Sequence, residues 1–283
     1  MDGETPKYLY HYTNVDSLAL ILKNRTLRLN SLDKMDDLQE QMSNDKQNFG
    51  KFVFVSSWTS EIEESIPMWR MYTPKQRGIR IKLPINPFQD YSAIGKDLEH
   101  ILHMKFDGDG NAVAPFKTII PFNDLINGGY TLLNFASDKQ LFEVKYTNDN
   151  TLLNPTLLSS TQQDGTNIAL GKLGIYKNSY WNFQKEWRYR LMFLPASTGK
   201  IIHEHMDNRN NELSNLIKLI SVGQASLPFS HFDLKLKEES LEDMTITLAP
   251  DISESAKIFV ELLVEKYNPS CKIEKSKLAD LIQ

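Results

Sequence analysis

The chain has 283 residues, of which 32 are basic and 36 acidic, so its formal net charge of -4 does not indicate a general polyanion partner. No apolar run is long enough to cross a bilayer, and the polar, acidic N-terminus is not a secretory signal. The single cysteine, Cys271, excludes an internal disulfide and a thiolate metal cage, and these features together predict a cytoplasmic protein that makes no membrane contact.

The first third of the chain alternates strand patterns with helical patterns. Strands are predicted at residues 8–13, 26–30, 52–58 and 78–83. Helical apolar spacing begins at Asn14, with Thr13 and Asp16 at the spacing of a capping pair. A second helical pattern ends at Tyr72, and Pro67 within it predicts a late start. The first strand therefore ends where the first helix begins.

The rest of the chain shows weaker patterns. Residues 141–146, 217–223, 243–248 and 271–276 predict strands, whereas residues 97–104, 151–160, 166–180 and 253–264 predict helices. We expect one α+β domain over residues 1–283, with an insertion at 86–138 and a C-terminal strand-helix-strand extension at 217–283.

One later strand pattern, at residues 182–194, carries an unusual set of charges. With a period of two, Glu186, Arg188 and Arg190 share one face, and the opposite face is largely aromatic. The simplest interpretation is an antiparallel strand with a solvated side, on which such charge pairs contribute roughly 0.2 to 1 kcal/mol each. The alternative is that Glu186 stands at the mouth of a cleft, held by the two arginines.

Generic metal and nucleotide motifs do not explain the chain. His203 and His205 have no third ligand nearby and are interpreted as part of a loop, and His100 and His103 are interpreted as a half-buried helix surface, so no metal site is predicted. No Walker loop or G-x-G-x-x-G motif joins a strand to a helix.

Five short motifs together resemble a known family. They are Leu-Tyr-His-Tyr-Thr at 9–13, Val-Ser-Ser-Trp at 55–58, Met-Trp-Arg-Met-Tyr at 68–72, Gly-Ile-Arg-Ile at 78–81 and Lys-Glu-Trp-Arg at 185–188. Their order resembles a large family of uncharacterised bacterial proteins. That family is related to the ADP-ribosyltransferase superfamily of the diphtheria-toxin and poly(ADP-ribose) polymerase type, whose sites use a His, a Tyr and a Glu in that chain order. The resemblance covers residues 8–193.

The resemblance implies a split antiparallel or mixed β-sheet core of the ADP-ribosyltransferase type, with flanking helices. It also implies that NAD is bound by four side chains. His11 would bond the adenosine ribose, Thr13 would lie near the nicotinamide amide, and Ser57 would line the pocket. Tyr72 would stack on the nicotinamide ring, although Tyr12 and Trp69 are alternative sources of that ring.

The remaining implied roles belong to the late strand. Glu186 would be the catalytic carboxylate that bonds the 2′-hydroxyl of the nicotinamide ribose. Gln184, Arg188 and Arg190 would bind or orient the acceptor. The family often has an acidic residue or a glutamine two positions before the glutamate to orient the acceptor, and Gln184 with Glu186 resembles the Q-x-E arrangement of some members.

The function implied is that of an NAD-dependent ADP-ribosyltransferase without a metal, acting on a cytoplasmic protein or nucleic acid as a toxin-like or phage-defence effector. An inhibitory partner protein is a further expected partner. Two alternatives stay open. One is a catalytically silent module that binds a nucleotide or a partner chain, and the other is an NAD glycohydrolase that uses water as the acceptor.

Overall fold

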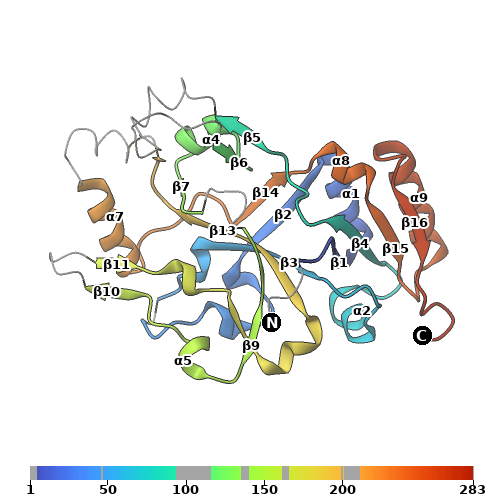
Figure 1. The fold of residues 1–283 in the computed structure, drawn as a ribbon, viewed down its shortest axis with the longest axis horizontal. Helices are drawn as coiled ribbons and strands as arrows, with labels where there is room; N and C mark the ends of the chain where they lie inside the picture. Colours follow the sequence, from blue (N-terminus) through green and yellow to red (C-terminus); the bar gives the residue numbers. More distant parts are fainter. Residues whose placement is uncertain are drawn as a thin grey trace.

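The computed structural model describes residues 5–45, 47–93, 116–134, 140–160, 166–198, 200 and 211–282. Within them the protein is a mixed α+β structure whose largest sheet has ten strands (Figure 1). These strands are β1 (Tyr8–Asn14), β2 (Thr26–Ser31), β3 (Val53–Thr59), β4 (Gly78–Pro84), β7 (Thr131–Leu132), β8 (Leu141–Glu143), β13 (Glu186–Leu194), β14 (His231–Lys235), β15 (Thr245–Leu248) and β16 (Lys272–Lys275). The β15–β16 pair is parallel and its neighbours are antiparallel, so the sheet is mixed.

Smaller elements surround this sheet. The paired short strands are β5 (Tyr91–Ala93) with β6 (Phe116–Thr118), β9 (Lys145–Thr147) with β12 (Tyr176–Asn178), and β10 (Leu158–Ser160) with β11 (Thr166–Ile168). The α-helices are α1 (Val15–Asn24), α2 (Ile66–Tyr72), α4 (Phe122–Asn127), α5 (Asn150–Leu153), α7 (Asn211–Ser221), α8 (Glu238–Glu242) and α9 (Glu254–Tyr267). The 3-10 helices are η1 (Leu32–Lys34), η2 (Leu38–Gln41), η3 (Gly50–Phe52), η5 (Leu170–Lys172) and η6 (Ser179–Gln184). None of these helices combines the length and apolar character needed to span a bilayer.

The sheet opens at strand β3. Strand β13 occupies one edge of β3 along its whole length, from the pair Glu186–Thr59 to the pair Met192–Val53. Because a strand has only two edges, β1 and β2 must share the other one. Strand β2 pairs at Val55 and Phe54, whereas β1 pairs only at Thr59. The two strands therefore diverge beside Ser56, Ser57 and Trp58, and α1 connects them.

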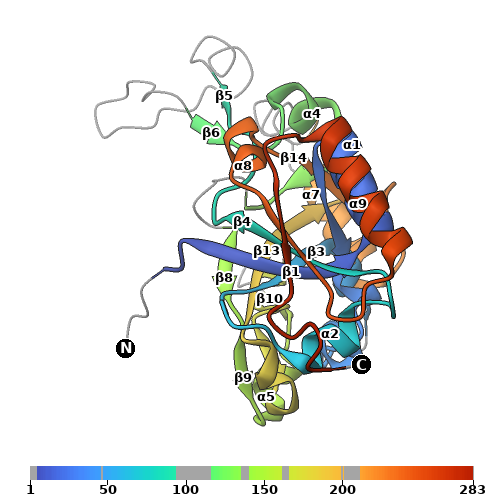
Figure 2. The same cartoon turned by 90° about the vertical axis from the view of Figure 1, so that its right-hand side faces the viewer.

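Helix α1 is held against the sheet by its apolar face. Its buried residues, Val15, Leu18, Ile21 and Leu22, belong to the main core together with the inner face of α9. The two helices lie side by side on the sheet (Figure 2). The predicted cap was wrong, because the side chain of Asn14 accepts the hydrogen bond from the Ser17 amide at 2.8 Å and neither Thr13 nor Asp16 does so.

The charged face of β13 is buried. Glu186 is 3% exposed and Arg188 is 0% exposed, so the interpretation of this face as solvated was wrong. On the opposite face Tyr189, Leu191 and Phe193 pack in the main core, as the alternation predicts. Both faces of the strand are thus covered, one by apolar side chains and the other by charged partners.

Two predicted helices between residues 151 and 180 were wrong. The first stops as α5 at Leu153, because Pro155 follows and disfavours helical backbone in the residue before it. In place of the second, the chain forms β11, η5 and β12. Gly174, with φ of +74°, turns the chain before β12. Left-handed backbone at this point is incompatible with a continuous helix.

The C-terminal extension begins with a helix, and the strand predicted at 217–223 was wrong. Leu216 and Ile220 are buried at helical spacing, while Leu219 and Val222 are exposed. The extension continues as β14, α8, β15, α9 and β16, so the predicted strand-helix-strand omitted β14 and α8. The helix predicted at 97–104 lies outside the described residues.

Candidate functional site

Two neighbouring pockets lie where the sheet opens. The larger has a volume of about 420 Å³ and the smaller one of about 90 Å³. Both are lined by residues from β1, β3, α2 and the segment after η1, namely His11, Met35, Asp36, Ser57 and Tyr72. The shared wall makes the two pockets parts of one site.

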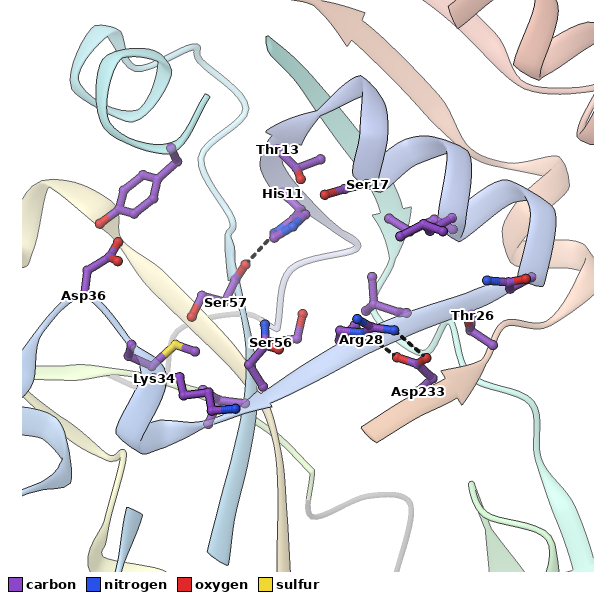
Figure 3. Close-up of a pocket in the computed structure, with 18 residues that line it drawn as sticks. His11, Thr13, Ser17, Thr26, Arg28, Lys34, Asp36, Ser56, Ser57 and Asp233 are labelled. Atoms are coloured by element: carbon purple, nitrogen blue, oxygen red, sulfur yellow. Dashed lines mark hydrogen bonds and ion pairs between the residues drawn. The ribbon is translucent and has the colours of Figure 1, made fainter. Parts of the chain in front are cut away.

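The larger pocket runs between α1, β2 and β3. Figure 3 shows His11 and Ser57 in the middle of this pocket, with Asp36 toward one end and the Arg28–Asp233 ion pair toward the other. That pair is bidentate, since Nε of Arg28 donates to Oδ1 of Asp233 at 2.8 Å and Nη2 donates to Oδ2 at 3.0 Å. Thr13 is buried and lines the same pocket. The pocket therefore combines apolar and polar side chains, which both α1 and the strands contribute.

His11 is fixed at the point where β1 and β3 diverge. Its Nδ1 lies 2.8 Å from the backbone oxygen of Ser57, and its ring packs on Trp58 with a centroid distance of 5.0 Å. A carbonyl oxygen only accepts, so Nδ1 carries the proton. Burial lowers the pKa of His11, while the hydrogen bond to Ser57 opposes this shift. The neutral ring then keeps an acceptor lone pair on Nε2.

Tyr72 and Gln184 meet across the small pocket. Tyr72 is the last residue of α2, and its hydroxyl accepts a hydrogen bond from Nε2 of Gln184. Gln184 ends η6, and Glu186 begins β13 after the single residue Lys185. Lys185 has φ of 44°, a left-handed conformation that ends η6. This tight turn places Gln184 and Glu186 on the same pocket wall.

Glu186 belongs to a buried cluster of four charges. The other members are Glu40 from η2, Lys177 from β12 and Arg188. Nε of Arg188 donates to Oε1 of Glu186 at 2.6 Å, and Lys177 donates to Oε2 at 3.2 Å. Nη2 of Arg188 contacts both carboxylates, at 2.6 Å for Glu40 and 3.1 Å for Glu186. The two acids therefore lie next to each other on one guanidinium.

The two carboxylates have opposite pKa shifts. Burial raises the pKa of Glu186, but the charges of Arg188 and Lys177, with hydrogen bonds from Arg188 and Ser57, outweigh burial and lower it to about 2. Burial also raises the pKa of Glu40, and there the same two cations do not overcome it. Such a divergence between neighbouring acids is typical of sites where one acid stays ionised and the other exchanges a proton.

Sequence reasoning missed Glu40 and Lys177. Lys177 donates to Gln184 at 2.8 Å as well as to Glu186, so it links the two residues that the family resemblance singled out. Both missed residues lie in very short elements, where no periodicity marks a face as buried. The sequence signal was the presence of Arg188 and Arg190 on one strand face, because buried arginines require carboxylate or carbonyl partners. That signal could be used only once the structure had shown this face to be buried.

The structure does not bring every predicted residue to the pockets. Arg190 lines neither of them, and its Nη1 donates instead to the carbonyl oxygens of Gly171 and Leu173. Burial and the nearby Arg188 lower the pKa of Arg190 to about 10. Of the alternative rings, Tyr12 lines the small pocket and Trp69 lines neither pocket. Tyr72 borders both.

Metal ligands do not gather in the part of the chain that the structure describes. No three His, Cys, Asp or Glu side chains there form a group that could hold a metal ion. The histidines at 100, 103, 203 and 205 lie outside the described residues. Comparison of the chain with protein-family models, with curated proteins and with solved structures finds no match.

Proposed function

We propose that the protein is an NAD-dependent ADP-ribosyltransferase that modifies a cytoplasmic macromolecule, either a protein or a nucleic acid. One observation carries the proposal. His11, Ser57, Tyr72 and Glu186 come from four separate elements and line one small pocket, with Glu186 buried and ionised. These are the residues whose order along the chain resembles the ADP-ribosyltransferase superfamily.

The charge of Glu186 suits the bond that must break. Cleavage of the bond between ribose C1′ and nicotinamide passes through an oxocarbenium-like state, as at a glycosidic bond. A carboxylate in a pocket shielded from water stabilises that developing positive charge strongly. Nicotinamide leaves without a strong acid because its ring nitrogen is already cationic. With a pKa of about 2, Glu186 is ionised at neutral pH and supplies the required charge.

The neighbouring side chains suit the rest of the nicotinamide ribose. Nε2 of His11 is an acceptor for a ribose hydroxyl, because Nδ1 is committed to Ser57. The Tyr72 ring borders both pockets and offers a face for the flat nicotinamide cation, a contact that contributes about 0.5 to 2 kcal/mol.

The sizes of the two pockets fit a ligand with one large and one small end. The larger pocket, at about 420 Å³, lies within the usual volume range of small-molecule sites. The smaller pocket, at about 90 Å³, can hold only part of a small molecule. We therefore assign the nicotinamide end to the small pocket and the adenosine end to the large one.

The test is nicotinamide release from NAD by the purified protein. Glu186→Gln keeps the size of the side chain and removes the charge, so we expect release to fall by about 100-fold or more. Glu143→Gln is the matched control, because Glu143 is exposed on the adjacent strand β8 and lines neither pocket. Equal rates for the wild type and Glu186→Gln would remove Glu186 from the mechanism.

The acceptor is identified in a second step. Mass spectrometry of a cell lysate treated with the protein and NAD should show a mass increase on a protein or nucleic acid. This outcome fits a toxin-like or phage-defence effector. NAD consumption without any modified macromolecule would identify an NAD glycohydrolase instead.

The ion pairing of Glu186 favours a second candidate function. Both carboxylate oxygens already accept hydrogen bonds from Arg188, and one of them also accepts from Lys177. A carboxylate so fully paired suits a silent module that binds a nucleotide without turning it over. Calorimetry with NAD separates the two functions, since binding without nicotinamide release supports the module.

A further inference from the structure

The small pocket contains a second buried carboxylate, that of Glu40. The residue is 5% exposed and lines the pocket beside Glu186. Its Oε1 is bonded by Nη2 of Arg188 at 2.6 Å and lies 3.6 Å from Nζ of Lys177. Its Oε2 is buried and has no hydrogen-bond partner among the described residues.

An unpaired buried carboxylate oxygen is costly. Leaving such an acceptor unsatisfied opposes folding by about 1–3 kcal/mol, and more when the group is charged. Natural structures retain these exceptions where the group has a catalytic or binding task. Because Glu40 lines the small pocket, its carboxylate lies beside the space that a ligand in this pocket would occupy.

Transfer to an acceptor with an O–H group requires a proton acceptor. Gln184, two residues before Glu186, is an amide and cannot take that proton. Glu186 is a weak base because the charges of Arg188 and Lys177 outweigh burial there and lower its pKa to about 2. Among the described residues at the same guanidinium, Glu40 is the remaining carboxylate.

We propose that Glu40 is the general base that removes the proton from the acceptor hydroxyl or water, an inference that rests on the proposed ADP-ribosyltransferase function. The acceptor oxygen forms a bond to ribose C1′ as the bond from C1′ to the nicotinamide nitrogen breaks. The electron pair of the broken bond stays with nicotinamide, which leaves neutral. The acceptor proton passes to the carboxylate of Glu40 and then to solvent.

The electrostatics of the cluster agree with this role. The pKa of Glu40 is raised, first by burial and then by the negative charge of Glu186. A raised pKa makes its carboxylate a better proton acceptor at neutral pH than the strongly paired Glu186. The two acids thus have different roles: Glu186 stabilises the positive charge that develops on the ribose, and Glu40 accepts the proton of the acceptor.

The experiment measures nicotinamide release from NAD, with water as the acceptor, by the wild type, Glu40→Gln and the control Glu143→Gln. Loss of a general base should slow Glu40→Gln by about 10²- to 10⁴-fold. The reactions are then repeated with azide, an anionic nucleophile that has no proton to lose. Azide should restore most of the lost rate and give ADP-ribosyl azide, which mass spectrometry detects.

Each outcome decides the role of Glu40. A Glu40→Gln rate equal to the wild-type rate overturns the proposal, and so does a slow variant that azide fails to restore, since that pattern indicates a structural defect. If thermal unfolding shows that Glu40→Gln does not fold, Glu40→Ala, which also lacks the carboxylate, is judged by the same two criteria. A wild type that releases no nicotinamide removes the proposed function together with this inference, whereas an active wild type with an unrescued variant removes this inference alone.

Discussion

At the scale of single residues, Arg188 organises the site. Its guanidinium donates hydrogen bonds to Glu186, to Glu40 and to the carbonyl oxygen of Gly174, while Lys177 forms ion pairs with the same two acids. Removal of one partner from a buried ionic cluster lowers the stability of the folded protein by more than the ion pair contributes to it, because a buried charge is left without a partner. The acids and cations of this cluster are therefore expected to respond together to mutation and to pH.

The pKa of Glu186 gives a prediction for stability at low pH. Its folded-state pKa of about 2 lies below the ordinary value of 4.5, so Glu186 stabilises the folded protein above pH 4.5. This stabilisation, at most about 3 kcal/mol, is lost as the pH falls from about 4.5 to about 2. Urea unfolding across this range should show a smaller loss for Glu186→Gln than for the wild type. Parallel curves for the two proteins would contradict the assigned shift.

Only some of the residues of the site could be predicted from the sequence. His11, Ser57, Tyr72 and Glu186 stand in strand or helix patterns, so the elements that carry them could be predicted. Tyr72 and Glu186 lie at the ends of their elements, whereas His11 and Ser57 lie inside β1 and β3. Their meeting in one pocket rested on the family resemblance, and their roles stay predictions. Glu40 and Lys177 could not be predicted, because burial of a lone charged residue in an irregular segment depends on partners more than a hundred residues away.

At the scale of elements, the first helix gives a prediction about its cap. Asn14→Ala removes the acceptor of the Ser17 amide and should lower the free energy of unfolding by about 0.5–2 kcal/mol. Ser17→Ala is the matched control, since it keeps the backbone donor and changes a side chain in the same turn. Urea unfolding of the two variants measures the difference. Equal stability of both would show that the cap contributes nothing.

Strands were easier to predict than helices in this chain. Strands β1, β3, β4 and β13 have alternating or continuous apolar patterns and were found to within a few residues. Helix α7 was mistaken for a strand because its apolar residues from 216 to 220 are closely spaced, and only burial distinguishes Leu216 and Ile220 from the exposed Leu219. Short apolar runs of this kind fit the helical period of about 3.6 residues and the strand period of about two residues equally well.

At the scale of the whole molecule, the pocket is assembled from distant parts of the chain. Its larger part is lined by several residues between His11 and Asp36, by residues 55–57, and by Tyr72 and Asp233. The strand order that brings them together depends on pairings such as β2 with β14 and β4 with β15. Local patterns carry no information about such pairings, so the topology could not be predicted from the sequence.

Hydrogen exchange tests this assembly. ADP-ribose, which lacks the bond to be cleaved, should slow amide exchange in β1, in β2 and in residues 55–57, because ligand binding suppresses opening of the segments that it contacts. Helix α9 is an internal reference, since it packs on α1 and lines neither pocket. Slowed exchange confined to α9 and β16 would place the binding site elsewhere.

The ion pair between Arg28 and Asp233 has a consequence for how the protein is made. These residues are 205 positions apart, yet both line the larger pocket. At about 5–20 residues per second, a ribosome needs roughly 10 to 40 s to synthesise the chain between them. During that time the first strands have emerged without their final neighbours. A nascent chain can therefore acquire the complete pocket only after Asp233 has been synthesised and has left the ribosome.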